Sequence, residues 1–184
     1  NSKEYFKLLI LRNPFKRLVS AYLDKIAKHK VPEQFAQDVI TEIQQSLGLE
    51  KDIEKSVTFS QFVNYIVDKN DEDLNDHWRP QNNFIGSVKF DLVGQFENLQ
   101  QVIEQIREKF GIDIRKKVSN HVTHYKEARE LSNCQDMYPC DLRQLGGMPT
   151  PFQMYSPHLK SLVRARYIED FNVYRDYFDI DAEV

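Results

Sequence analysis

The stretch LLILRNPFKRLVSAYLDKI, residues 8–26, constrains the fold more than any other part of the sequence. It begins within an apolar run, residues 5–11, whose length and continuous hydrophobicity are typical of a strand covered on both faces in a parallel sheet. Asn13 and Pro14 then provide an N-cap and a first-turn proline, which are the signals that open a helix. Apolar side chains follow at helical spacing and predict one buried stripe: Phe15, Leu18, Val19, Tyr22 and Ile26. The stretch therefore predicts a strand, a tight turn and a helix.

Basic side chains gather where this strand meets the helix. Arg12 is the last residue of the predicted strand, and Lys16 and Arg17 lie in the first helical turn. In open α/β sheets, ligands bind at the carboxyl ends of strands, where a helix N-terminus suits phosphate. Arg12 can present a planar fork of N–H groups to phosphate oxygens, and Ser20 can add a hydroxyl if its helix face lines the same cleft. The residues predict an anion site, and the alternative is a basic helix exposed to solvent.

A second strand-then-helix unit lies in the middle of the chain. FDLVGQF, residues 90–96, predicts a strand, and ENLQQVIEQIREKFG, residues 97–111, predicts a helix that Gly111 ends. Two such units are typical of an α/β protein. We therefore expect a parallel sheet flanked by helices.

The remaining segments are predicted as helices and loops. Residues 33–47 are expected to form a surface helix, and a further helix starts at Thr58, which has capping-box spacing with Gln61. Residues 130–157 are expected to be loop-like. The last helix is expected to start after Ser156 and Pro157, which repeat the cap-plus-proline signal of Asn13 and Pro14. The C-terminal part is thus predicted to be rich in helix.

Length and composition narrow the class of protein. A chain of 184 residues suits a single domain over residues 1–184, and 41% hydrophobic with 29% charged residues is typical of a soluble globular protein. The net charge of -3 argues against a nucleic-acid partner, and the apolar runs are too short for a membrane segment. Cys134 and Cys140 are too few for a disulfide-stapled fold, and they either close one small loop or remain free thiols.

Five motifs occur in the order found in one known family. RNPFKRLVSAY, residues 12–22, matches the pattern R-x-P-F-x-R-x-x-S-x-Y, and FSQFVNYI, HWRPQ, FDLVGQFENL and YIEDFNVY follow it. These segments resemble the successive motifs of the Golgi-type carbohydrate sulfotransferases, which include the chondroitin sulfotransferases. The five matches cover most of residues 8–174.

The resemblance implies a P-loop-NTPase-like sulfotransferase fold and an enzymatic activity. The donor would be 3′-phosphoadenosine 5′-phosphosulfate (PAPS), the product adenosine 3′,5′-bisphosphate, and the acceptor a hydroxyl of a carbohydrate or related small molecule. Arg12 and Ser20 would hold the 3′-phosphate, and Arg17 belongs to the same cofactor-binding motif.

Two departures from the family pattern affect what we expect. The family's 5′-phosphosulfate loop has no counterpart before Lys3, so we expect it upstream of this sequence, unless the domain is non-catalytic. Animal relatives often carry cysteines after H-W-x-P, where this chain has NNFIGSVK, and this favours a bacterial member. The expected location is the cytoplasm for a bacterial protein and the Golgi lumen for a eukaryotic fragment.

Sulfuryl transfer to a hydroxyl needs a base that accepts the proton of the acceptor. His77 is the candidate catalytic base, because it lies in a predicted loop beside Asp76, which could orient its ring. The alternative is a packing role next to Trp78. Arg79 is the candidate for binding an anionic acceptor.

No metal is expected at the site. His121 and His124 form an H-x-x-H pair without a convincing third or fourth ligand.

Two other functions stay open: a nucleotide- or sulfated-ligand-binding module that has lost catalysis, and a P-loop kinase. The kinase would need a Walker lysine and a magnesium-binding acid, neither of which is visible. The oligomeric state is not predicted.

Overall fold

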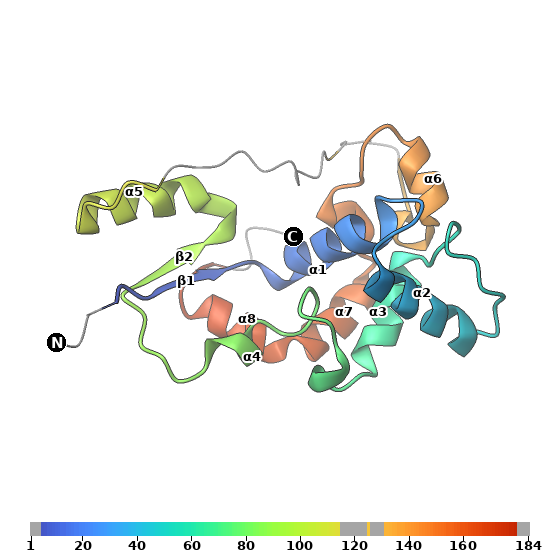
Figure 1. Cartoon of the computed structure of the whole chain (residues 1–184), viewed down its shortest axis with the longest axis horizontal. Coiled ribbons are helices and arrows are strands. Elements are labelled where there is room, and N and C mark those ends of the chain that lie inside the picture. Colours follow the sequence, from blue (N-terminus) through green and yellow to red (C-terminus); the bar gives the residue numbers. More distant parts are fainter. Residues whose placement is uncertain (1–4, 115–124, 126–130, 180–184) are drawn as a thin grey trace.

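The computed structural model describes residues 5–114, 125 and 131–179 (Figure 1). Two short strands, β1 (Leu8–Leu11) and β2 (Leu92–Gln95), form a parallel sheet in which Leu8 pairs with Leu92 and Leu11 with Gln95. The predicted parallel pairing is therefore confirmed, although each strand is shorter than the apolar run that predicted it. In the described residues the sheet has these two strands.

Helices make up most of the remaining structure. They are α1 (Pro14–Tyr22), α2 (Gln34–Ser46), α3 (Phe59–Val67), α4 (Asn82–Ile85), α5 (Leu99–Phe110), α6 (Pro139–Gln144), α7 (Pro157–Arg166) and α8 (Ile168–Arg175). The structure is thus mixed, helix-rich and built around a small parallel sheet, which is compatible with the α/β fold that the resemblance implies.

The turn from β1 into α1 forms as the sequence predicts. Pro14 opens the helix, and the Asn13 Oδ1 atom accepts hydrogen bonds from the N–H groups of Phe15 (3.0 Å) and Lys16 (3.2 Å). The chain does not stay α-helical as far as Ile26, because residues Leu23–Ala27 widen into a π-helical turn. The apolar stripe is nevertheless buried as expected.

The segment 130–157 differs from the prediction. It contains α6 and two short 3₁₀ turns, Cys134–Asp136 and Pro151–Met154, rather than loops alone. Two prolines of this segment, Pro139 and Pro151, occupy first-turn positions, where a missing N–H group is tolerated. Pro139 and Pro151 therefore begin helical turns instead of interrupting them.

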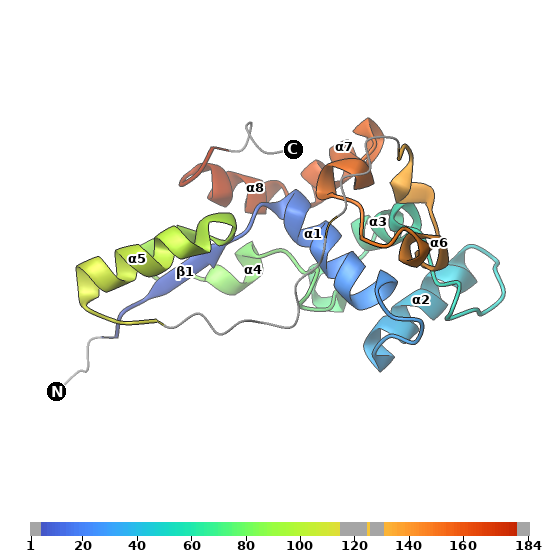
Figure 2. The same cartoon turned by 90° about the horizontal axis from the view of Figure 1, so that it is seen from above.

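The core has two parts on opposite sides of the sheet. Figures 1 and 2 both place the sheet and α5 at one end of the molecule, α2, α3 and α6 at the other, and α1 between them. The larger cluster joins α1, α3, α7 and α8 around the buried Trp78, and a smaller one packs β1 and β2 against α5. This arrangement leaves the carboxyl end of β1 at the middle of the molecule. Of the described helices, none is both long and apolar enough to cross a membrane.

Candidate functional site

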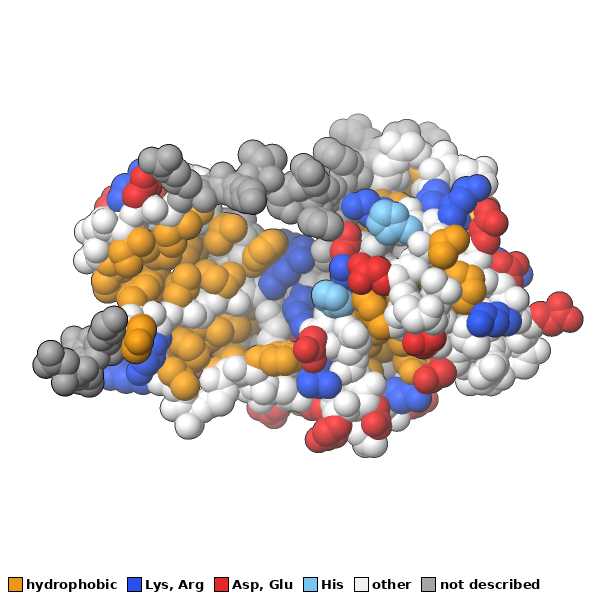
Figure 3. Space-filling view, in the orientation of Figure 1, with side chains coloured by type: hydrophobic (Ala, Val, Ile, Leu, Met, Phe, Trp, Pro, Cys, Tyr) orange, Lys and Arg blue, Asp and Glu red, His pale blue; other side chains and the backbone are white. Residues whose placement is uncertain are grey.

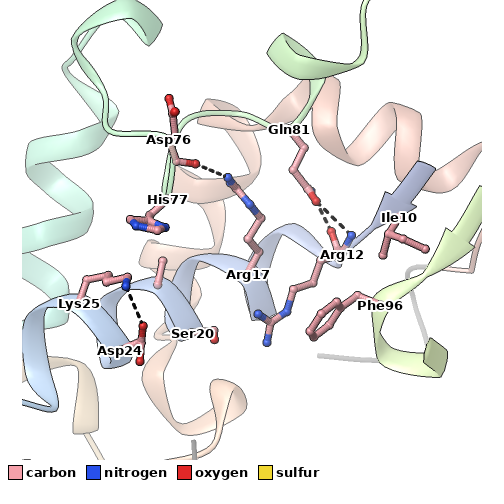
Figure 4. A pocket seen from close by; sticks show the side chains of 11 residues that line it. Ile10, Arg12, Arg17, Ser20, Asp24, Lys25, Asp76, His77, Gln81 and Phe96 are labelled. Carbon is pink, nitrogen blue, oxygen red and sulfur yellow. Dashed lines mark hydrogen bonds and ion pairs between the residues drawn. The ribbon is translucent and has the colours of Figure 1, made fainter. Parts of the chain in front are cut away.

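A cleft of about 470 Å³ lies beside the carboxyl end of β1 and along α1 (Figure 4). Arg12, Arg17, Ser20 and His77 all line it, so the structure brings together four of the five site residues predicted from the sequence. The lining is completed by Ile10, Ala21, Asp24, Lys25, Asp76, Gln81 and Phe96. In the space-filling view, Lys, Arg and His side chains gather around the hollowed middle of this face (Figure 3).

The Arg12 guanidinium is held by stacking rather than by hydrogen bonds. It lies 4.6 Å from the centre of the Phe96 ring, and its Nε atom is 3.9 Å from Glu97 Oε1. The Nε atom is buried and has no hydrogen-bond partner in the described part of the chain. Because a buried donor without an acceptor is unfavourable, this arginine is suited to an anion that enters the cleft.

The N-terminus of α1 is not itself available to an anion. Asn13 already accepts hydrogen bonds from the N–H groups of Phe15 and Lys16, which are among the first free donors of the helix. Side chains would therefore provide the main contacts with a phosphate here. Arg12 and Ser20 reach the cleft from the same side of α1 (Figure 4).

The backbone of Arg12 is bracketed by one side chain. Its N–H group donates to Gln81 Oε1 (3.1 Å), and its C=O group accepts from Gln81 Nε2 (2.9 Å). Asp170 of α8 holds Gln81 in turn, since its two carboxylate oxygens accept from the N–H groups of Gln81 and Asn82, each at 2.8 Å. Sequence reasoning missed both residues, although each lies within a quoted motif, HWRPQ or YIEDFNVY.

Arg17 points away from Arg12 and toward the loop that carries His77 (Figure 4). Its Nη2 atom donates to the carbonyl oxygen of Asp76 at 2.9 Å. Burial lowers the pKa of the Arg17 guanidinium, while the neighbouring Tyr167 and Asp170 act in the opposite direction. Arg17 therefore links α1 to the loop that carries His77.

His77 borders the cleft, but Asp76 does not orient its ring as expected. The Asp76 carboxylate pairs with Arg79 instead, at 3.2 Å between Oδ1 and Nη1. The His77 ring lies 5.6 Å from the Phe35 ring, centre to centre. Burial lowers the pKa of His77, and the positive charge of Lys25 lowers it further. The lowered pKa favours the neutral imidazole, the form that can accept a proton.

Lys25 lies on the π-helical turn and lines the same cleft as His77. Its Nζ atom is 3.2 Å from Asp24 Oδ2 and 3.5 Å from Glu33 Oε1. Burial alone would lower the pKa of Lys25, but hydrogen bonding and charge pairing with these two carboxylates raise it overall. Lys25 therefore remains a cation beside His77.

Arg79 does not line the cleft. Its Nε and Nη2 atoms donate to the carbonyl oxygens of Asp71, Glu72 and Leu74. Together with the Asp76 ion pair, these bonds wrap the acidic loop DKNDEDLND, residues 68–76, around the guanidinium. The structure thus gives Arg79 a loop-stabilising environment rather than one facing an acceptor in the cleft.

Comparisons with known proteins decide the family. A family model described as "Sulfotransferase family" matches residues 1–178. The chain belongs to this sulfotransferase family. The resemblance to carbohydrate sulfotransferases that the five motifs indicated is thereby confirmed.

Several vertebrate relatives of this sulfotransferase-family chain carry the name carbohydrate sulfotransferase. Carbohydrate sulfotransferase 14 of Danio rerio is 29% identical over 128 residues, covering 67% of this chain and 35% of the relative. The Homo sapiens protein of the same name is 31% identical over 112 residues, covering 57% and 30%. Carbohydrate sulfotransferase 11 of Mus musculus is 31% identical over 120 residues, covering 60% and 34%. The chain thus spans about a third of the length of these relatives, and no solved structure matches it.

The motifs of the sulfotransferase-family chain contact one another in the fold. The Tyr22 hydroxyl donates to the carbonyl oxygen of Val57, which precedes the capping box of α3, at 2.9 Å. The Tyr167 hydroxyl donates to the carbonyl oxygen of Trp78 in HWRPQ. Glu97 of FDLVGQFENL accepts from the Asn13 N–H group at 3.2 Å. These bonds, with those of Gln81 and Asp170, join four of the five motifs. The fifth, FSQFVNYI, meets the end of α1, where the Phe59 ring lies 5.2 Å from the Tyr22 ring, centre to centre.

Other candidate groups lie apart from the cleft. Within the described ranges, no three His, Cys, Asp or Glu side chains are grouped closely enough to hold a metal ion. His121 and His124 lie outside the described residues. Cys134 and Cys140 are both free thiols, the former buried.

Proposed function

We propose that this chain is part of a PAPS-dependent sulfotransferase that acts on a carbohydrate hydroxyl, and that the cleft holds the nucleotide end of the donor. One observation carries the proposal. The Arg12 guanidinium, whose buried Nε lacks a hydrogen-bond partner among the described residues, and Ser20 line one cleft at the carboxyl end of a parallel strand.

The residues present suit a 3′-phosphate. A phosphate monoester carries close to two negative charges, and a fixed guanidinium with a nearby hydroxyl can offer it charge-assisted hydrogen bonds. Arg17 lines the same cleft, but it also donates to Asp76, so its role in donor binding stays a prediction. When bound, PAPS would supply the sulfuryl group, and adenosine 3′,5′-bisphosphate would be the leaving product.

His77 is proposed as the general base. Its lowered pKa favours the neutral imidazole, which could accept the proton of an acceptor hydroxyl at the cleft. The acceptor role predicted for Arg79 is not carried into the proposal, because its donors are taken up by the acidic loop. Arg79 would instead hold that loop, which leads into His77.

The proposal also includes the topology of the sheet, the number of domains and the cellular location. The β1–α1 unit and the parallel sheet support a P-loop-NTPase-like topology. The hydrogen bonds that join four of the motifs, and the ring contact of Tyr22 with Phe59 of the fifth, support one domain over residues 1–184. The vertebrate origin of the relatives named above supports the Golgi lumen, the location expected for a eukaryotic chain, over the bacterial cytoplasm.

The activity is tested by following labelled sulfate from PAPS into desulfated chondroitin and other hydroxyl-bearing saccharides. We expect transfer by the full-length protein, which would include the 5′-phosphosulfate loop. We expect Arg12→Met in that protein to lower transfer at limiting PAPS by about tenfold to a hundredfold, the loss of one or two charge-assisted hydrogen bonds. Arg107→Met is the matched control, since Arg107 is exposed and pairs only with Asp113 among the described residues. Binding of adenosine 3′,5′-bisphosphate without transfer to any acceptor would favour the non-catalytic module, and preference for ATP would favour a kinase.

The role of His77 needs a separate variant. His77→Gln should abolish transfer while the affinity for adenosine 3′,5′-bisphosphate stays within about twofold, because the base contributes to the chemical step rather than to binding. Retained transfer would remove His77 as the base.

A further inference from the structure

We propose that Gln81 is a positioning residue for Arg12, and that the Asp170–Gln81 pair sets how well the cleft distinguishes nucleotides with a 3′-phosphate from those without one. The inference rests on the proposed function. It concerns residues outside the predicted site that act on Arg12 from two distant parts of the chain.

Gln81 acts where strand pairing stops. The β1–β2 ladder ends at the pair Leu11 and Gln95, and Arg12 follows without a strand partner in the described residues. The Gln81 carboxamide takes both main-chain groups of Arg12, accepting from N–H at 3.1 Å and donating to C=O at 2.9 Å. A side-chain amide thus does for Arg12 what the peptide groups of a neighbouring strand do for the residues of β1.

Gln81 is itself anchored. Its own N–H group donates to Asp170 Oδ2, and the next N–H group, that of Asn82, donates to Asp170 Oδ1, both at 2.8 Å. Asp170 is only 3% exposed, and hydrogen bonds from N–H groups to a buried carboxylate are strong. Pro80 further restricts the backbone before Gln81. The carboxamide therefore extends from a fixed backbone position.

The position of the Arg12 side chain depends on the two hydrogen bonds between Gln81 and the Arg12 main chain, because few other contacts fix it. Its guanidinium stacks on Phe96, a ring that is 45% exposed, and its Nε atom is too far from Glu97 for a hydrogen bond. Phosphate contacts depend steeply on geometry, so a small shift of the Arg12 backbone would weaken them. Contacts with the rest of a nucleotide would not change in the same way.

The preference for a nucleotide with a 3′-phosphate over one without it tells whether Gln81 positions Arg12 or only stabilises the fold. Adenosine 3′,5′-bisphosphate and adenosine 5′-monophosphate differ only in the 3′-phosphate, so the ratio of their dissociation constants measures that contact alone. A merely structural role for Gln81 would change both affinities alike or lower only the unfolding temperature. A positioning role would change the ratio.

The first variant is Gln81→Met, which keeps the length of the side chain and removes its polar atoms. We expect calorimetric titration to show the ratio falling by about tenfold, almost entirely through weaker binding of the bisphosphate. The matched control is Gln100→Met, at an exposed position of α5 away from the cleft lining, which should leave the ratio unchanged.

The second variant, Gln81→Glu, allows the bracket to be restored by pH. At pH 7.5 an ionised carboxylate places an oxygen against the C=O group of Arg12, so the ratio should be low. Near pH 5, protonation begins to return an O–H donor in place of Nε2, and the ratio should recover toward that of the unmodified chain at the same pH. Burial raises the pKa of Asp170, which holds Gln81, and of Glu97, which lies beside Arg12. Measuring the unmodified chain at each pH removes the titration of these two groups, of the nucleotides and of His77 from the comparison.

The outcomes are distinct. If the unmodified chain does not prefer the bisphosphate, the proposed function fails and the inference fails with it. If the unmodified chain prefers the bisphosphate but Gln81→Met shows the same ratio, the inference alone is overturned. Should Gln81→Met fail to fold, Gln81→Glu decides, because a ratio that tracks the unmodified chain at every pH would overturn the inference.

Discussion

At the scale of single residues, unpaired polar atoms mark the candidate site. Four buried side-chain N or O atoms lack a hydrogen bond in the described part of the chain, and three of them belong to Arg12, Asn13 and Glu97. Such atoms are unfavourable in a folded protein, and their concentration at one place often indicates a ligand. Here they lie at the carboxyl ends of both strands, where a ligand is expected in this fold class.

Glu97 should give the protein a measurable pH dependence. Burial raises the pKa of this carboxyl group, so the folded state binds its proton more tightly than the unfolded state does. The stabilisation is present at acidic pH, below the ordinary glutamate pKa, and is lost as pH rises through the elevated value. In Glu97→Gln, whose Oε1 can still accept from Asn13, the free energy of unfolding should decline less between about pH 4.5 and 7. Urea denaturation at several pH values checks this, and an unchanged slope would contradict it.

Lys25 should control the protonation of His77. Burial is the largest cause of the lowered His77 pKa, and the Lys25 charge is the next. In Lys25→Met, the charges of Asp24 and Glu33 near the imidazole would no longer be balanced, so the His77 pKa should rise. Titration of the imidazole signals by NMR checks the shift, with Lys30→Met, an exposed lysine paired with Glu54, as the matched control. A His77 pKa that is unchanged or lower in Lys25→Met would show that this electrostatic account is wrong.

The sequence predicts those site residues whose side chains can themselves bind phosphate or accept a proton. Arg12, Ser20 and His77 stand out by residue type and motif, and the structure places all three at one cleft. Gln81, Glu97 and Asp170 were missed because their importance comes from partners 69 to 89 positions away in the chain. No local pattern distinguishes a glutamine that brackets a backbone from one exposed to solvent.

At the scale of elements, local signals predicted where helices begin better than how they continue. The caps at Asn13, Thr58 and Ser156 all form as expected, and Gly111 ends α5 in the left-handed conformation. The π-helical turn after Tyr22 was not predicted, because its residues fit an α-helix equally well. Strand ends were overestimated, because pairing stops where the partner strand stops.

At Gly94, β2 packs tightly against Val102 of α5. A Cβ atom there would lie 2.7 Å from both Cγ atoms of Val102 and 3.0 Å from Cδ1 of Ile10. Gly94→Ala should therefore lower the free energy of unfolding by about 1–3 kcal/mol, the usual range for overpacking a core. Chemical denaturation measures the change.

The compensating variant makes the Gly94 test specific. Val102→Ala alone opens space and should also destabilise the protein. In Gly94→Ala with Val102→Ala, the added methyl group fills part of that space, so the combined loss should be smaller than the sum by more than about 0.5 kcal/mol. Strictly additive losses would show that close packing of β2 on α5 does not explain this glycine.

At the scale of the whole molecule, the fold brings together motifs that are far apart in sequence. The order of the motifs predicted the family, and the alternation of strand and helix predicted a parallel sheet. How the motifs pack against one another could not be predicted, because it depends on tertiary bonds such as those of Tyr167 to Trp78 and Asp170 to Gln81. Figures 1 and 2 show α1 between the sheet end and the helical end, and side chains of α1 line the cleft.

The central claim is that the cleft at Arg12 and Ser20 recognises a 3′-phosphate. Calorimetric titration of the chain with adenosine 3′,5′-bisphosphate, adenosine 5′-monophosphate and ATP tests it most directly. We predict that the bisphosphate binds at least about tenfold more tightly than either competitor, and that Arg12→Met removes this preference, since tenfold corresponds to one good hydrogen bond. Equal or tighter binding of adenosine 5′-monophosphate or ATP, or an undiminished preference in Arg12→Met, would contradict the claim.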